Sequence, residues 1–357
     1  MNENDMGQHE LLALLDQAIE LKASDLHIVS GTPAMVRIDG NLSPLKGDSF
    51  TPETSAAIIS GFIGKDLHEG ILKTRQESDF SFSYKKLRVR CNAYLQRGML
   101  SASFRILPAQ VPTPQELGIP PIVSELVARN QGLFLVCGPT GHGKSTTLAS
   151  LISQICLTRR SHVITIEDPI EYFYEQHKSI VSQREIGVDT PSYHDALRSA
   201  LREDPDVVMV GEMRDLETIE ATLEIAETGH LVFATLHTNS AAQTANRIID
   251  VFPAAQKDQV RAQLADSLLG IISQRLLPTV KGGRVLAAEV LVVNQAIRTL
   301  IRDGKTHQIP NVMQTSASDG MISLDKSLAE LVTRGIVSIE DALAWSTDPR
   351  VLKALIY

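Results

Sequence analysis

The fold is decided by the stretch LFLVCGPTGHGKSTT, residues 133–147. Its middle part fits the pattern G-x-x-x-x-G-K-[ST] at every fixed position, which is typical of a loop that wraps the phosphates of a nucleoside triphosphate. An apolar run precedes the loop and an amphipathic segment follows it, so the sequence predicts a strand, the loop and then a helix. In that context the loop N–H groups and the helix N-terminus both face bound phosphate.

The side chains of this loop have distinct expected tasks. Lys144 is expected to reach the β- and γ-phosphates, and Ser145 is expected to ligate Mg²⁺. A chance glycine-rich turn is the alternative, and the strand, loop and helix context argues against it. The expected phosphate-binding residues are Gly138, Pro139, Thr140, Gly141, His142, Gly143, Lys144, Ser145 and Thr146.

The composition limits the classes of function. A chain of 357 residues is too long for one ordinary core and suits two domains. A net charge of −8 and an aromatic content of 4% argue against a protein that grips nucleic acid or an anionic membrane. The three cysteines form no C-x-x-C pair, and no signal peptide or membrane-spanning apolar run is visible. We therefore expect a soluble cytoplasmic protein without a zinc site.

A proline-rich stretch, residues 108–121, is predicted to link two domains, because proline fixes φ and lacks an N–H donor. The N-terminal part, residues 1–107, combines one helical pattern with short alternating segments and is predicted to be a small α+β domain. The C-terminal part, residues 122–357, alternates apolar strands with helices and is predicted to hold a mostly parallel sheet. From about residue 255 onward a mainly helical region is expected, with a short strand near 285–293.

A hairpin is predicted at the end of the N-terminal domain. The segment RVRCNAYL alternates apolar and polar residues, and SASFRI returns after a turn at Arg97. Arg90 and Arg105 are predicted to share the polar face of this hairpin. A solvated basic face is the simple interpretation of such arginines.

Two glutamates follow predicted strands of the C-terminal domain. Glu167 ends the strand VITI, and Glu212 comes two residues after the strand VVMV, with Gly211 where a magnesium-binding aspartate is usual. In an open α/β sheet such groups meet at the carboxyl ends of the strands, where hydrolysis needs a carboxylate to hold Mg²⁺ or orient water. Two histidines, His230 and His237, flank the strand LVFATL, and either imidazole could sense a γ-phosphate.

Four motifs occur in an order that resembles the secretion and type IV pilus ATPase family. They are the Walker A motif GPTGHGKST, the Asp box ITIEDPIEY, the Walker B motif VVMVGEMRD and the His box TGHLVFATLHTNS. The N-terminal segment ASDLHIVSGTPAMVRIDG is similar to the first, PAS-like domain of the family. The resemblance implies an α/β protein with a PAS-like α+β domain, a RecA-like P-loop ATPase domain and a C-terminal helical region.

The resemblance also implies roles for single residues. ATP would bind between the two domains of each subunit in a ring of six. Glu212 would be the Walker B glutamate, holding Mg²⁺ directly or through water, and Glu167 the Asp-box residue that acts as base on water. His230 would be the His-box residue near the γ-phosphate. Members of the family carry arginine fingers in the region of the predicted hairpin, and the candidates are Arg90, Arg97 and Arg105.

The branch of the family follows from two further features. The chain lacks the tetracysteine site of pilus extension and type II secretion ATPases, and its segment AIRTLIRD, residues 296–303, resembles the AIRNLIRE signature of the PilT-like retraction ATPases. Thr299 replaces Asn, and Asp303 replaces Glu. A buried stripe is expected of Ile297, Leu300 and Ile301. Arg298 and Arg302 are expected to couple the ring to another subunit or to the membrane platform.

The function implied by this branch is retraction of type IV pili by a homo-hexameric ATPase. Its implied partners are an inner-membrane platform protein of the pilus and a second retraction ATPase. The implied location is the cytoplasmic side of the inner membrane, without insertion into it. Two alternatives remain open: an accessory subunit of a retraction motor, and a secretion or DNA-translocating ATPase.

Overall fold

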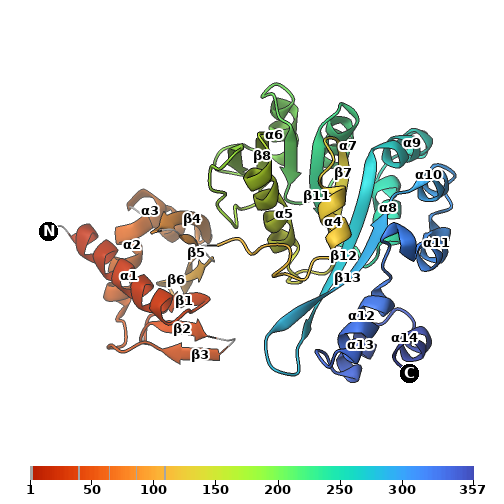
Figure 1. The fold of residues 1–357 in the computed structure, drawn as a ribbon. Helices are drawn as coiled ribbons and strands as arrows, with labels where there is room; N and C mark the ends of the chain where they lie inside the picture. The colour runs from red at the N-terminus through yellow and green to blue at the C-terminus, as the bar shows by residue number, and fades with distance from the viewer. Residues whose placement is uncertain (1–2, 39–40, 64, 86, 108–109) are drawn as a thin grey trace. The chain divides into compact units, whose positions relative to one another are not determined.

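The computed structural model describes residues 3–38, 41–63, 65–85, 87–107 and 110–357. The chain divides into two compact units. Unit 1 comprises Met1–Gln110 with Glu171–Phe173, and unit 2 comprises Val111–Ile170 with Tyr174–Tyr357. Figure 1 shows both units, with unit 1 in red and orange and unit 2 running from yellow to blue.

The predicted linker, residues 108–121, holds no helix or strand over the described residues 110–120. Helix α4 (Pro121–Leu126) then begins with Pro121 at its first position, where a missing N–H costs nothing. Pro108 and Ala109, where the linker is predicted to begin, lie outside the described residues. The predicted boundaries of the domains stay predictions.

Unit 1 is an antiparallel sheet packed against helices, in the order β3-β2-β1-β6-β5-β4. Its described elements are α1 (Glu3–Glu20), β1 (Asp25–Ile28), β2 (Met35–Ile38), β3 (Asn41–Pro44), α2 (Pro52–Ile63), α3 (Lys65–Thr74), β4 (Ser78–Tyr84), β5 (Leu87–Gln96) and β6 (Met99–Ile106). The predicted hairpin is confirmed as β5 and β6. Val89, Cys91 and Ala93 are buried, because alternate residues of β5 face the helices α1 and α2.

Unit 2 is an α/β domain that continues into C-terminal helices. Its elements are α4, β7 (Gly132–Cys137), α5 (Lys144–Thr158), β8 (His162–Glu167), β9 (Ile180–Glu185), α6 (Tyr193–Ala200), β10 (Val207–Val210), α7 (Leu216–Glu227), β11 (Leu231–Leu236), α8 (Ala241–Asp250), α9 (Lys257–Ser267), β12 (Leu268–Pro278), β13 (Arg284–Val292), α10 (Gln295–Arg302), η1 (Thr306–Gln308), α11 (Ile309–Thr315), η2 (Ala317–Asp319), α12 (Leu324–Thr333), α13 (Ile339–Trp345) and α14 (Pro349–Ile356).

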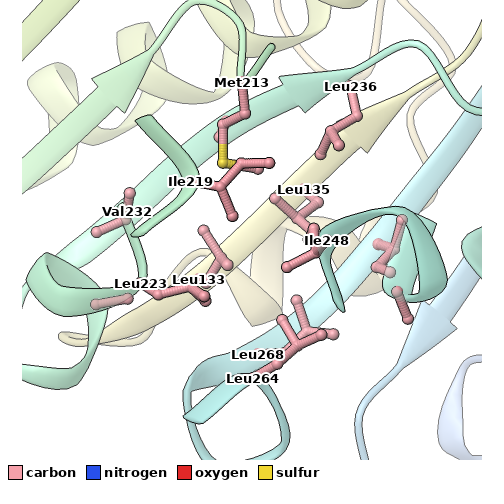
Figure 2. Close-up of a cluster of buried hydrophobic side chains, with 14 of the residues drawn as sticks. Leu133, Leu135, Met213, Ile219, Leu223, Val232, Leu236, Ile248, Leu264 and Leu268 are labelled. Carbon is pink, nitrogen blue, oxygen red and sulfur yellow. The ribbon is translucent and has the colours of Figure 1, made fainter. Parts of the chain in front are cut away.

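The sheet of unit 2 has the order β13-β12-β7-β11-β10-β8-β9. The strands from β12 to β9 pair in parallel, and β13 pairs with β12 in the antiparallel direction. Figure 2 shows the core on one face of this sheet, where Leu133 and Leu135 of β7 meet Ile219 of α7 and Ile248 of α8. The mostly parallel sheet predicted from the sequence is therefore confirmed.

The prediction of a mainly helical region after residue 255 is wrong at β12. This strand covers the segment LLGIISQRLLP and is buried along most of its length. Because β12 lies between β7 and β13 and is covered on both faces, its sequence is a continuous apolar run without period-two alternation. Such a run cannot be distinguished from a buried helix by its pattern alone. The strand predicted near 285–293 is confirmed as β13.

The buried stripe predicted for the segment AIRTLIRD is confirmed in α10 for Ile297 and Ile301, which are fully buried, whereas Leu300 is only partly buried against the same core. Asn294 caps this helix by accepting a hydrogen bond from the N–H of Ile297. Thr299, which replaces the Asn of the signature, donates to the carbonyl of Gln295 one turn earlier. The side chain of Thr299 therefore turns back on its own helix.

The two arginines of α10 both engage the end of α9. Arg298 donates to the carbonyls of Ala265 and Asp266, the second at 2.8 Å, and Arg302 pairs with the Asp266 carboxylate at 2.7 Å. Carbonyls in the last turn of a helix lack partners within that helix, and cations stabilise them there. Arg298 therefore ties α10 to α9 inside the chain, and the coupling of these arginines to a partner stays a prediction.

Candidate functional site

The glycine loop between β7 and α5 lies directly against β12. A Cβ atom at Gly138 would stand 2.5 Å from the carbonyl oxygen of Gln274, and Gly138 has φ +145°. Only glycine fits both the close approach and this backbone conformation. Gly141 also has a positive φ, and Gly143 has φ +81° at the N-cap of α5. The loop thus has the backbone conformations that a phosphate cradle needs.

Lys144 is buried and points back into this loop. Its ammonium donates to the carbonyls of Gly138 at 3.0 Å and Pro139 at 3.1 Å, and lies 3.4 Å from Nδ1 of His237. The Thr140 hydroxyl lies 3.2 Å from the same nitrogen. The loop therefore holds the lysine head group at its own centre, where a phosphate would bind.

His237 joins the phosphate loop to the acidic strand end. An ammonium only donates hydrogen bonds, so Nδ1 of His237 accepts from Lys144 and the ring proton resides on Nε2. Nε2 lies 3.1 Å from Oε1 of Glu212, to which it donates. Arg214 holds the other oxygen, Oε2, at 2.7 Å. Lysine, imidazole, carboxylate and guanidinium thus form one continuous chain of contacts.

These contacts set the charge of Glu212. Burial raises the pKa of this carboxyl, but the hydrogen bonds from Arg214 and His237 and the charge of Arg214 outweigh burial and hold the pKa below its ordinary value. Glu212 is therefore ionised at neutral pH. An ionised, partly buried carboxylate beside a phosphate loop can bind a divalent cation or orient water.

Glu167 ends β8 at the same edge of the sheet and is nearly inaccessible to solvent, with 7% exposure. The Thr165 hydroxyl donates to its Oε1 at 2.7 Å, and the Gln183 amide donates to the same atom at 3.2 Å. β8 and β10 pair in parallel, so Glu167 and Glu212 lie on neighbouring strand ends. The structure brings together the two predicted carboxylates.

Gly211 occupies the position where a magnesium-binding aspartate is usual. The atoms around Gly211 leave little room for a larger residue. A Cβ there would stand 3.0 Å from the Tyr193 hydroxyl, 3.2 Å from the carbonyl of Ile166 and 3.4 Å from Cα of Glu167. A side chain at 211 would require these neighbours to shift by a few tenths of an ångström, and the acidic group stands one residue later, at Glu212. Burial raises the pKa of Tyr193 strongly, and the nearby charges of Asp168 and Glu212 add to the effect.

His230 is not at the phosphate loop, contrary to the assignment that the family resemblance implies. It immediately precedes β11, and its Nδ1 donates to the carbonyl of Ile225 at 3.0 Å. β11 is parallel to β7, so its beginning and end lie at opposite edges of the sheet. His237, which follows the strand, takes the position beside the phosphate site. Six strand residues, about 20 Å of rise, separate the two histidines.

The three candidate arginines lie at two places in unit 1. Arg90 of β5 and Arg105 of β6 are direct partners across the hairpin, and Arg105 donates to Asp25 at 3.0 Å. Arg97 lies in the turn, just after Gln96, with φ +51°. Gln96 follows Arg90 by six positions along β5, a rise of about 20 Å. One phosphate therefore cannot receive all three guanidinium groups from the same subunit.

β12 supports the phosphate loop through contacts that no local sequence pattern indicates. The amide of Gln274 donates to the carbonyl of His142 at 2.6 Å, and the N–H of Leu276 donates to Nδ1 of the His142 ring at 2.9 Å. Burial and the charges of Arg275 and Lys144 hold the pKa of His142 below its ordinary value, so the ring stays neutral. Recognition of β12 as a strand would have been needed to find this contact.

Comparison with known proteins places the chain in a family. A model of the type II/IV secretion system protein family matches residues 4–344. The chain belongs to this family. Its members share the P-loop fold described above, and the α/β prediction with an N-terminal α+β domain and a RecA-like ATPase domain is confirmed.

Two relatives within the secretion system family are similar along nearly their whole length. The type IV pilus retraction ATPase PilT of Pseudomonas aeruginosa is 45% identical over 338 residues, which cover 93% of this chain and 97% of that protein. The type IV pilus ATPase PilU of the same organism is 37% identical over 349 residues, covering 97% of this chain and 91% of that protein. The similarity is greater to the retraction ATPase.

A solved structure of this secretion system family matches the described fold. It is a crystal structure of the pilus retraction motor PilT with bound ADP, and the chain superimposes with a TM-score of 0.90 and 50% sequence identity. The match covers 96% of this chain and 98% of that chain. Within the described residues of this chain, no helix combines the length and apolar character of a membrane span.

We expect replacement of His237 with Ala to lower ATP hydrolysis by about 10- to 100-fold, because a hydrogen bond to the charged Glu212 and the contact with Lys144 are both lost. The measurement is steady-state phosphate release by the purified protein. His230→Ala is the matched control, expected to lower thermal stability but to keep the rate within about threefold. A larger rate loss in His230→Ala than in His237→Ala would contradict the placement.

Proposed function

We propose that the chain is an ATP-hydrolysing motor that assembles as a ring of six copies and retracts type IV pili. One observation carries the enzymatic part: Lys144 of the phosphate loop, His237 and the ionised Glu212 are in direct contact at the carboxyl edge of the sheet. The similarity to PilT, whose crystal structure holds ADP, supports the nucleotide and the direction of pilus movement.

The chain offers oxygen ligands that suit Mg²⁺. The Ser145 hydroxyl is exposed in the first turn of α5, and Glu212 supplies an ionised carboxylate at the edge of the neighbouring strands. Mg²⁺ would be held by Ser145 and, directly or through water, by Glu212, where it neutralises charge on the transferred phosphoryl group. Lys144 and the loop N–H groups would bind the phosphates and keep them in line.

The two glutamates are proposed to divide the remaining work. Glu212 receives donors on both carboxylate oxygens, from His237 and Arg214, which suits a group that orients and stabilises charge. Glu167 is held by Thr165 and Gln183 at the end of β8, beside the strand that precedes Glu212. We assign Glu167 as the base that accepts the proton of the attacking water.

The proposed assembly is a homo-hexamer at the cytoplasmic face of the inner membrane. Its proposed partners are a platform protein of the pilus base and a second retraction ATPase. Sequential ATP binding and product release around the ring would turn or shift the platform protein. No nucleic acid takes part in this proposal, in agreement with the net charge of −8 and the aromatic content of 4%.

Two other functions are compatible with the same ATPase fold. An accessory subunit, as the similarity to PilU suggests, would join another motor and generate little force alone. A secretion or DNA-translocating ATPase would use the same site on another substrate. The α10 segment AIRTLIRD favours the retraction motor over both, because it resembles the signature of the PilT-like ATPases.

Deletion of the gene in the source organism tests the proposed function. We expect more surface pili and loss of twitching, both restored by the wild-type chain but not by Lys144→Ala. A second strain that carries this chain and no other retraction ATPase distinguishes a motor from an accessory subunit. Only a motor restores twitching in that strain. Normal twitching in the deletion strain would reject the retraction function.

We expect Glu212→Gln to retain nucleotide binding and to lower hydrolysis by about 10²- to 10⁴-fold, because the amide keeps the shape but not the charge. Glu167→Gln should lose a similar factor. The rate constant and the dissociation constant for ADP are measured on each variant. Glu217→Gln, an exposed change in the first turn of α7, is the matched carboxylate control. Normal turnover in Glu212→Gln would refute its role.

The arginines are tested by mixing subunits. Arginine fingers contribute about 10³- to 10⁵-fold in rate where measured, so Arg97→Ala or Arg105→Ala should lower turnover far more than ATP affinity. Because Arg105 also pairs with Asp25, thermal stability is measured in parallel. Rings that mix Arg105→Ala with Lys144→Ala subunits should regain activity if the arginine acts on a neighbouring subunit. Absence of recovery would place its action within one subunit.

A further inference from the structure

The C-terminal helices reach the phosphate loop through one aromatic residue. Trp345, the last residue of α13 and the chain's single tryptophan, lies with its ring centroid 5.1 Å from that of His142. The two rings meet edge to face, with 72° between their planes. This is the preferred geometry of aromatic pairs. His142 lies inside the G-x-x-x-x-G-K loop, directly between Gly141 and Gly143.

The same indole also covers a buried arginine of β12. The guanidinium of Arg275 lies 5.4 Å from the centre of the Trp345 ring, and Arg275 is only 4% exposed. Arg275 donates from Nη2 to the carbonyl of Asn239 at 2.8 Å. Asn239 follows His237 by two residues in the loop after β11. Trp345 therefore contacts the phosphate loop through His142, and it contacts Arg275, which holds the loop after His237.

Hydrogen bonds to α12 fix the segment that follows Trp345. The three residues after it are anchored on Asp325 of α12: the hydroxyl of Ser346 donates at 2.7 Å, the N–H of Thr347 at 2.9 Å and the N–H of Asp348 at 3.2 Å. The helices α12, α13 and α14 share a core with β12 and β13, beside which they lie in Figure 1. These contacts thus fix the position of the indole relative to α12, α13 and α14.

We propose that Trp345 is a positioning residue for nucleotide binding, which acts through His142 on the phosphate loop and through Arg275 on the His237 loop. The inference rests on the proposed ATPase function. It adds that the C-terminal helices, far along the chain from every sequence motif of the site, respond to nucleotide occupancy. The coupling is reciprocal, because a contact that stabilises the loaded loop is itself stabilised by loading.

The test uses equilibrium binding of MgADP to the full-length protein. Edge-to-face aromatic contacts correspond to about 2- to 12-fold in affinity, so Trp345→Ala should weaken MgADP binding by that factor. The rate at saturating ATP should change less than about twofold. Trp345→Phe keeps a ring edge against His142 and should restore most of the affinity. Leu355→Ala, an exposed change on α14, is the matched control and should bind normally.

A double-mutant cycle tests whether the effect passes through His142. In a His142→Ala background the further change Trp345→Ala should cost clearly less affinity than in the wild-type protein, because only the path through Arg275 remains. Fully additive losses would overturn the proposal, and so would equal losses in Leu355→Ala and Trp345→Ala. Wild-type protein that fails to bind MgADP would instead reject the proposed ATPase function, so the two failures are distinguishable.

Tryptophan fluorescence gives a readout that requires no change at Trp345. Because the chain has one tryptophan, its emission reports the surroundings of Trp345 alone. MgADP should alter the emission of the wild-type protein, and His142→Ala should remove most of that response at saturating nucleotide. An unchanged emission on binding, or an undiminished response in His142→Ala, would overturn the coupling.

Discussion

The close contact between Gly138 and β12 is the constraint on which the site depends. A phosphate loop must leave β7, turn sharply and enter α5, and here it does so with the backbone of Gln274 packed against it. This contact requires a glycine on one side and a straight, buried strand on the other. β12 supplies the strand, and its residues Gln274 and Leu276 also fix His142. The segment that positions the loop thus comes from the second half of the chain.

Much of the fold was accessible from the sequence because its patterns were local. The apolar strands of the parallel sheet, the hairpin of unit 1 and the glycine loop each carry their signal within a few residues. β12 does not, since burial on both faces removes the alternation that identifies a strand. The contacts of Gln274 with His142 and of Arg275 with Asn239 follow only from the position of β12 beside β7.

The positions of the acidic residues of the candidate site were also predictable from the sequence. Glu167 and Glu212 follow apolar strands, and the rule for parallel sheets places both at one edge. The choice between His230 and His237 follows from the direction of β11, since a residue before a parallel strand lies at the edge opposite the loops that follow it. The crowding by Tyr193 could not be predicted, because it depends on the side-chain packing of α6 against strand ends.

The packing around Gly211 has a consequence for how this site could change during evolution. A single substitution that introduces aspartate after β10 would push its Cβ toward the Tyr193 hydroxyl and the backbone of β8. Aspartate at 211 would therefore require the Tyr193 hydroxyl and the end of β8 to move by a few tenths of an ångström. Glutamate at 212 supplies the acidic group without that shift.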